Sequence, residues 1–159
     1  MGLEIERKFL VKEDIWDSFP KGKGEFYKQG YISTEPSKTI RVRLTETNAF
    51  LTIKGLSQGY SRMEFEYSIP QEDAKQLLEN FCSNIISKIR YKVLYQSHLW
   101  EVDVFLEDNA GLIIAEIELQ SENEFFELPP WINEEVTTDE RYYNSYLSQN
   151  SFKNWKNNI

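Results

Sequence analysis

The chain has 159 residues and a formal net charge of −8, with 40% hydrophobic and 28% charged residues, a composition ordinary for a globular protein. No run approaches the roughly 18 consecutive apolar residues that a membrane span needs, which excludes such a span. We expect no membrane partner, and the acidic balance argues against a nucleic-acid partner. We expect one domain over residues 1–159, in the cytoplasm, because the start lacks a signal-peptide pattern and Cys82 is the lone cysteine.

Alternation of apolar and polar residues predicts eight β-strands. They are expected over residues 1–11, 26–32, 39–44, 49–55, 60–69, 85–95, 99–107 and 112–120. Short helices are expected over 13–19, over 71–82 after Pro70, and over 140–147, where Thr138 is the expected cap. The connections are mostly short, so we predict a mainly β (α+β) fold, a closed antiparallel barrel with helices outside. Trp16, Phe19, Trp131 and Trp155 are expected to be packing residues.

The first strand places Glu4, Glu6 and Lys8 on one face. Two carboxylates about 7 Å apart, followed by an ammonium, suit a divalent metal beside an anion. A strand face that points into water is the alternative.

The same sorting of charge recurs in other strands. One set of seven basic residues comprises Lys8, Arg41, Arg43, Lys54, Arg62, Lys88 and Arg90, and one set of seven acidic residues comprises Glu4, Glu6, Glu64, Glu66, Asp103, Glu116 and Glu118. The two sets cancel, so the net charge of −8 lies elsewhere. Like charges two residues apart repel each other, and buried ions are costly unless they are paired. From the residues alone, these charges either surround a metal and a polyanion inside the barrel or face water outside it.

Eight short motifs in order resemble the CYTH superfamily, the triphosphate tunnel metalloenzymes, and especially its short bacterial members. The motifs are Glu4-x-Glu6-x-Lys8, Arg41-x-Arg43, Thr52-x-Lys54, Arg62-x-Glu64-x-Glu66, Lys88-x-Arg90-Tyr91, Trp100-Glu101-Val102-Asp103-Val104-Phe105, Glu116-x-Glu118 and Glu135-Val136-Thr137-x-Asp139-x-Arg141-Tyr142. The resemblance implies a barrel whose charges point inward, a dependence on Mg²⁺ or Mn²⁺, and a small-molecule triphosphate as substrate. By analogy with the family, a C-terminal helix closes one mouth of the tunnel.

The resemblance also implies roles for the charged residues. Glu4, Glu6 and Glu118 are the best metal ligands, followed by Glu116 and Asp103. Phosphate oxygens are gripped by Lys8, Arg41, Arg43, Lys54, Lys88 and Arg90, with Arg62 ranked lower as a partner for carboxylates. The catalytic set is Glu64, Glu66, Lys88 and Arg90, in which Glu64 or Glu66 orients or deprotonates the attacking water. For Glu64, Glu66 and Asp103, salt bridges to arginines are the alternative.

The expected activity is hydrolysis of inorganic triphosphate to phosphate and pyrophosphate, with nucleoside triphosphates as further substrates. An adenylyl cyclase that makes cyclic AMP from ATP is the alternative enzyme. Such members often carry a His-Phe pair before the Glu-x-Glu-x-Lys motif, and this chain has none because the motif begins at Glu4. A non-catalytic module that binds polyphosphate or nucleotide is the third alternative. We expect a monomer or a homodimer.

Overall fold

The computed structural model describes residues 2–158, which form nine β-strands and several short helices. The strands are β1 (Leu3–Val11), β2 (Glu25–Ser33), β3 (Thr39–Leu44), β4 (Ala49–Lys54), β5 (Ser61–Ser68), β6 (Ile85–Tyr95), β7 (His98–Phe105), β8 (Ile113–Glu118) and β9 (Ile132–Glu135). The α-helices are α1 (Glu13–Ser18), α2 (Gln71–Phe81) and α3 (Asn144–Leu147), and the 3₁₀ helices are η1 (Glu107–Asn109), η2 (Glu140–Tyr142), η3 (Phe152–Asn154) and η4 (Lys156–Asn158). None of the described helices is long and apolar enough to cross a membrane.

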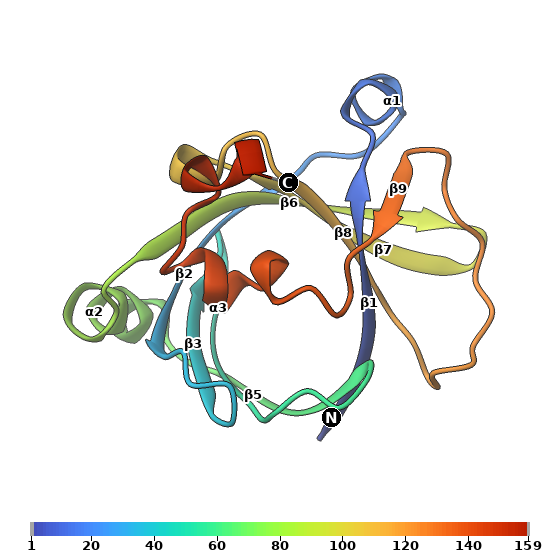
Figure 1. Ribbon diagram of the computed structural model, residues 1–159. Helices are drawn as coiled ribbons and strands as arrows, with labels where there is room; N and C mark the ends of the chain where they lie inside the picture. Colours follow the sequence, from blue (N-terminus) through green and yellow to red (C-terminus); the bar gives the residue numbers. More distant parts are fainter. Residues whose placement is uncertain (1, 159) are drawn as a thin grey trace.

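Strands β1 to β8 close into an antiparallel barrel, as the sequence predicts. Their order around the barrel is β5-β4-β3-β2-β6-β7-β8-β1, and the pairing of β1 with β5 closes the ring. Figure 1 shows this ring with α1 and α2 outside it and the segment around α3 lying across its opening. The predicted fold class is therefore confirmed.

Strand β9 was not predicted from the sequence. It pairs with the end of β1, opposite Phe9 and Val11. The same edge of β1 pairs with β5 at residues 3–5. Four residues are too few to show an alternating pattern, and Pro129-Pro130 before them predicts a bend. The correction adds one strand beside the barrel and leaves its eight-stranded ring unchanged.

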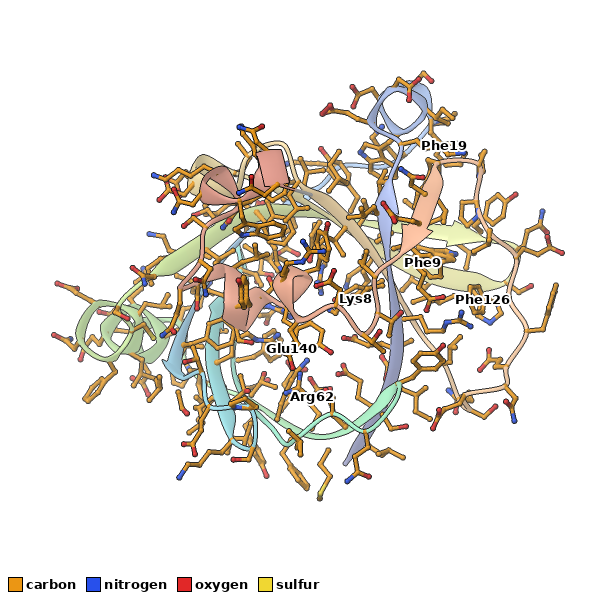
Figure 2. The ribbon with its side chains drawn as sticks, in the orientation of Figure 1. Lys8, Phe9, Phe19, Arg62, Phe126 and Glu140 are labelled. Atoms are coloured by element: carbon orange, nitrogen blue, oxygen red, sulfur yellow. The ribbon has the colours of Figure 1, made fainter. Side chains whose placement is uncertain are left out.

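The apolar faces of the strands point outward, which is the reverse of an ordinary barrel. In β1 the neighbours Lys8 and Phe9 are both buried but lie on opposite sides of the strand, Lys8 toward the interior (Figure 2). Phe9 packs edge-on against Trp100 and Phe126 at centroid distances of 5.6 and 6.2 Å. The hydrophobic core therefore lies between the barrel and the elements that cover it.

Three hydrophobic clusters form this outer core. Trp16 of α1 and Trp131 join the first, on the side of β1, β7 and β8. Leu78 of α2 joins the second, against β3 and β4. Leu147 of α3 and Phe152 of η3 join the third, against β6 and β8. The expectation that Trp16 and Trp131 serve packing is confirmed, since their exposed fractions are 2% and 0%.

The helix expected over residues 140–147 is divided in two. Tyr143 has an extended backbone, with φ −74° and ψ 138°, and separates η2 from α3. The cap is Asp139 and not Thr138, because the Asp139 carboxylate accepts a hydrogen bond from the backbone N–H of Arg141 at 3.1 Å. This interruption changes the direction of the chain at Tyr143. The residues that follow then lie at the mouth of the barrel.

Candidate functional site

The barrel interior holds a polar cavity of about 200 Å³. Thirteen of the fourteen charged residues singled out in the sequence line it: Glu4, Glu6, Lys8, Arg41, Arg43, Lys54, Arg62, Glu64, Glu66, Lys88, Arg90, Glu116 and Glu118. The exception is Asp103, which is 1% exposed and lies behind Lys88 and Arg90. The structure therefore brings the two sets together inside the barrel, and the reading in which they face water is wrong.

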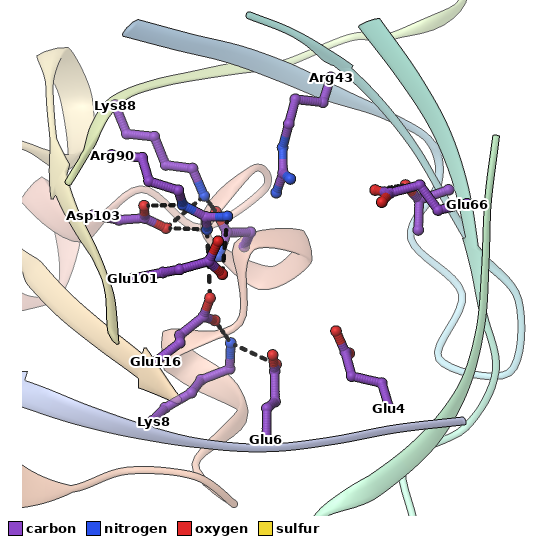
Figure 3. A network of polar contacts seen from close by, with 12 residues as sticks. Glu4, Glu6, Lys8, Arg43, Glu66, Lys88, Arg90, Glu101, Asp103 and Glu116 are labelled. Carbon is purple, nitrogen blue, oxygen red and sulfur yellow. Dashed lines mark hydrogen bonds and ion pairs between the residues drawn. The ribbon is translucent and has the colours of Figure 1, made fainter. Parts of the chain in front are cut away.

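A chain of ion pairs runs along one wall of this cavity (Figure 3). Asp103 pairs with Lys88 and Arg90, both at 2.7 Å, and Arg90 reaches Glu116 at 3.4 Å. The Lys8 ammonium bonds Glu116 and lies 3.2 Å from Glu6. Burial alone would lower the pKa of Lys8, but the carboxylates of Glu116 and Glu6 outweigh it and raise the pKa.

Both carboxylate oxygens of Asp103 accept hydrogen bonds within this series of ion pairs. Its Oδ1 accepts from Arg90 Nε, and its Oδ2 accepts from Lys88 Nζ and from Arg90 Nη2 at 2.9 Å. Burial works to raise the pKa of Asp103, yet Arg90 and Lys88 hold it well below its usual range. This geometry favours the salt-bridge alternative for Asp103 over the role of metal ligand.

Glu116 is held in the same way. Burial opposes its ionisation, but Lys8 and Arg90 lower the pKa of Glu116 to about 2. Its two oxygens each face a cation, Oε2 toward Lys8 and Oε1 toward Arg90. Glu116 therefore carries a full negative charge that these cations already offset.

Glu4, Glu6 and Glu118, which we call the acidic group, have the opposite character. Partial removal from water raises the pKa of all three, against the effect of Lys54 on Glu4 and of Lys8 on Glu6. Neighbouring carboxylates raise the pKa further: Glu64 for Glu4, Glu116 for Glu6, and Glu4 for Glu118. Glu6 and Glu118 are direct partners across the β1–β8 ladder. Repulsion between carboxylates at this place indicates a site that a cation would stabilise.

The donor set of the acidic group fits a hard divalent cation, because carboxylate oxygens are the ligands that Mg²⁺ and Mn²⁺ prefer. Within residues 2–158, no three Asp, Glu, His or Cys side chains stand close enough together to form a ready-made metal cluster. The fit therefore rests on the chemistry and crowding of these carboxylates.

Arg41, Arg43 and Lys88, which we call the cationic group, crowd positive charge in the same cavity. Burial, together with Arg41 and Arg90, lowers the pKa of Arg43 to about 10. Burial also lowers the pKa of Lys88 to about 7, although Asp103 opposes the shift. The Nε of Arg41 is buried and has no hydrogen-bond partner among the described residues. Such a group is suited to bind an anion with several oxygens.

The remaining predicted residues lie on β4 and β5. Lys54 lies 3.2 Å from Glu4 and 3.4 Å from Glu64. Glu66 accepts a hydrogen bond from Thr52 at 3.1 Å and lies 3.6 Å from Arg41. Arg62 points into the ring (Figure 2), and its Nε donates to the carbonyl of Gly55 at 3.1 Å. Salt bridges thus involve Glu64 and Glu66, while Glu66 stays accessible, with 42% of its side chain exposed.

The sequence interpretation missed several residues of the cavity. Tyr31 lines it from β2, and Tyr143, Asn144 and Ser145 line it from the C-terminal segment. Gln29 is fully buried and bonds both Arg43 and Asn144. The period of two from Gln29 to Tyr31 marks an inward face of β2, but these side chains are uncharged and drew no attention.

A barrel closed around such a charged cavity defines a class of proteins that bind polyanions inside a β-barrel. The chain belongs to the CYTH domain family, whose model matches residues 2–149. It is 49% identical to the inorganic triphosphatase of Acetivibrio thermocellus over 157 residues, which cover 98% of this chain and 99% of that protein. It is 38% identical to the inorganic triphosphatase of Nitrosomonas europaea over 152 residues, which cover 91% of this chain and 96% of that one. The crystal structure of the inorganic triphosphatase NE1496 is similar, with 34% identity, a TM-score of 0.63 and coverage of 91% of this chain and 96% of that one.

Proposed function

We propose that this protein is a metal-dependent hydrolase that converts inorganic triphosphate into phosphate and pyrophosphate, with residues 1–159 acting as a single CYTH domain. The observation that carries the proposal is the sorting of charge in the cavity. The acidic group crowds carboxylates, and the cationic group crowds buried cations. A divalent cation bound together with a polyanion offsets both excesses at once. The identities of 49% and 38% to inorganic triphosphatases support the substrate.

The cations of the cavity position the substrate. Arg41 and Arg43 on β3 and Lys88 and Arg90 on β6 face the same space, so phosphate oxygens between them are gripped from two sides. Phosphoryl transfer needs little covalent chemistry from the protein, since alignment and charge stabilisation dominate. Lys88 and Arg90 offset the charge that develops during transfer, and Lys8, Lys54 and Arg62 complete the cationic lining.

Glu4, Glu6 and Glu118 would hold Mg²⁺ or Mn²⁺, with Glu116 beside them. The ion supplies charge neutralisation and lowers the pKa of water when bound. Asp103 we assign to holding Lys88 and Arg90 in place.

Glu64 and Glu66 are the proposed acceptors of the proton of the attacking water. Both are on β5 and line the cavity, and Glu66 is the more accessible of the two. Water attacks the terminal phosphorus in line with the departing pyrophosphate. The P–O bond to the bridging oxygen breaks, the new P–O bond forms, and the carboxylate takes the proton.

Phosphorus NMR tests this proposal. The purified protein is incubated with Mg²⁺ or Mn²⁺ and inorganic triphosphate, then with ATP. Equal amounts of phosphate and pyrophosphate from triphosphate are expected. Pyrophosphate with cyclic AMP from ATP would establish the cyclase instead, and binding without turnover would establish the non-catalytic module. The cytoplasmic location and the choice between monomer and homodimer stay predictions, and sedimentation measures the latter.

A further inference from the structure

Asn144 links the C-terminal segment to two cations of the cavity. It is the first residue of α3, and its side chain lines the cavity. Its amide oxygen accepts a hydrogen bond from Lys88 Nζ at 3.0 Å and another from Gln29 Nε2 at 2.9 Å. Both donors are fully buried or nearly so, with exposed fractions of 1% for Lys88 and 0% for Gln29. One oxygen atom thus joins α3 to β6 and β2.

The contact with Lys88 limits how this ammonium can turn. A lysine ammonium has three N–H donors. Asp103 Oδ2 takes one at 2.7 Å and Asn144 takes a second at 3.0 Å, so one donor is left for the cavity. With two donors fixed, the direction of the third is set. Asn144 is neutral, so it fixes Lys88 without reducing the positive charge available to an anion.

The contact with Gln29 extends the effect to Arg43. Gln29 uses both ends of its amide: Nε2 donates to Asn144, and Oε1 accepts from Arg43 Nε at 3.2 Å. A side chain of β2 thereby holds the Nε of Arg43, and the other nitrogens of the guanidinium are left for a ligand. The guanidinium carbon of Arg43 also lies over the ring of Tyr27, at 5.0 Å from the ring centroid, a cation–π contact that further restrains this side chain.

The C-terminal segment does not depend on Asn144 for its attachment. Tyr142 and Leu147 on either side of it are each 1% exposed and belong to the outer hydrophobic core. Asp139 and Arg141 are joined by their own hydrogen bonds. Because packing anchors the segment, the polar contacts of Asn144 are available to act on the cavity.

We propose that Asn144 is a positioning residue for triphosphate binding, whose amide oxygen aims Lys88 directly and Arg43 through Gln29. The proposal rests on the proposed function, because it assigns the aimed cations to the oxygens of a bound triphosphate. Loss of this aim leaves the charge of Lys88 in the cavity, where it still offsets the charge that develops during transfer, but weakens the hold on the oxygens of substrate and transition state alike. Such a loss raises KM and leaves kcat nearly unchanged.

The test measures binding as well as turnover. A triphosphate analogue in which methylene groups replace both bridging oxygens has no P–O–P bond to hydrolyse. It is titrated into the protein in the presence of Mg²⁺ by calorimetry, and kcat and KM are measured with triphosphate. Asn144→Ala is expected to raise Kd and KM about tenfold and to change kcat less than about threefold. The control Asn150→Ala removes an exposed amide of the same segment, which donates to the carbonyl of Tyr146 at 3.4 Å and is not among the described residues that line the cavity. It is expected to keep Kd within about twofold.

A double-mutant cycle separates positioning from a general structural effect. In a Lys88→Ala background, Asn144→Ala is expected to raise Kd less than about threefold, because only the link through Gln29 is left to lose. The same tenfold loss in both backgrounds would overturn the proposal, as would a wild-type Kd in Asn144→Ala. Binding of the analogue without hydrolysis of triphosphate by the wild type would overturn the proposed function, while a raised Kd in Asn144→Ala would still support the role of Asn144.

Discussion

Asp103 and Glu6 show how the same functional group acquires opposite properties inside one barrel. Asp103 accepts three hydrogen bonds from Lys88 and Arg90, and the pKa of its carboxyl is held well below the usual range. Glu6 is half-buried near Glu116 and Glu4, and the pKa of its carboxyl is raised although Lys8 opposes the shift. The cations around Asp103 outweigh the effect of burial on its carboxyl, whereas Lys8, which Glu6 shares with Glu116, does not outweigh burial and the neighbouring carboxylates at Glu6. Substitutions at the two positions should therefore have opposite consequences.

Asp103→Ala should destabilise the fold. The change leaves the ammonium of Lys88 and the guanidinium of Arg90 buried beside each other without their carboxylate. Breaking a buried ion pair in this way lowers the free energy of unfolding by about 3–5 kcal/mol. Urea denaturation measures the change. The control Asp108→Ala breaks the exposed pair with Lys153 and should cost at most about 1 kcal/mol. Equal stabilities of the two variants would contradict the structural role of Asp103.

Glu6→Gln should keep the fold and lose activity. The amide removes one of the repelling charges, so the free energy of unfolding should stay the same or rise slightly. The same change removes a proposed metal ligand, and metal-dependent release of phosphate should fall about 100-fold or more. Glu134→Gln on β9 is the matched control, because Glu134 is exposed and outside the cavity. Wild-type turnover in Glu6→Gln would refute the metal assignment.

At the scale of residues, the sequence predicts which side chains enter the cavity but not how they pair. The period of two in each strand places Glu4, Glu6 and Lys8 on one face, and the structure places them there. Which carboxylate is offset depends on register between strands, such as Arg90 opposite Asp103 and Glu6 opposite Glu118. A single strand carries no information about its register with another. This is why the sequence left Asp103 open between metal ligand and salt bridge.

Strand β9 is held to the barrel by a charged contact on the outside of β1. The guanidinium of Arg7 donates to both carboxylate oxygens of Glu135, at 2.6 and 2.8 Å. Thr137 donates to the same carboxylate and accepts from the backbone N–H of Lys8 at 3.0 Å. The contact therefore fixes the start of the C-terminal segment next to a residue of the cavity.

The pair of Arg7 and Glu135 should make part of the stability sensitive to acid. The hydrogen bond from Arg7 lowers the pKa of Glu135, against the effect of burial. Stabilisation from a lowered carboxyl pKa is fully present above the unfolded value of about 4.3 and is lost as the pH falls through the folded value. Glu135→Gln should lower the free energy of unfolding by about 1 kcal/mol at pH 7. Urea denaturation at several pH values should show this difference shrinking below about pH 4. A difference that does not vary with pH would contradict the ionic origin of the effect.

At the scale of elements, the sequence predicts long alternating strands well and short or divided elements poorly. The ranges 39–44 and 85–95 agree with β3 and β6 as observed. The helix expected over 140–147 is interrupted at Tyr143, because packing of Tyr142 and Leu147 on the barrel decides the path of the chain. Asn144 enters the cavity as a result of this interruption. The local sequence pattern carries no information about this packing of distant residues.

The whole molecule is organised so that its apolar surface lies outside the barrel and its paired charges lie inside. The outer clusters are covered by α1, α2 and the C-terminal segment. The closed ring of β1 to β8 leaves the interior to the acidic and cationic groups. A barrel stabilised from outside tolerates unfavourable crowding of like charges within. Binding of ligands whose charge is opposite to that of each group relieves this crowding and lowers the free energy of the folded state.

Ligand binding should accordingly stabilise the protein, and the cation and the anion should act together. A ligand at 100 times its Kd adds about 2.7 kcal/mol to the free energy of unfolding, a rise in Tm of roughly 5–10 °C for a chain of this length. Differential scanning fluorimetry with Mg²⁺ and the methylene-bridged triphosphate analogue should show this rise. Mg²⁺ alone or the analogue alone should give a smaller rise in Tm than the two together.

Sodium chloride at the same ionic strength is the control for screening of the crowded charges. Sodium chloride should raise Tm less than the metal and analogue together do, because a monovalent salt screens like charges without bridging the acidic and cationic groups. In Glu6→Gln the part of the rise that depends on Mg²⁺ should disappear, while the part due to the analogue alone should remain. Equal shifts with sodium chloride and with the metal–analogue pair would mean that the cavity charges respond to ionic strength only, and the paired-ligand interpretation of their sorting would fail.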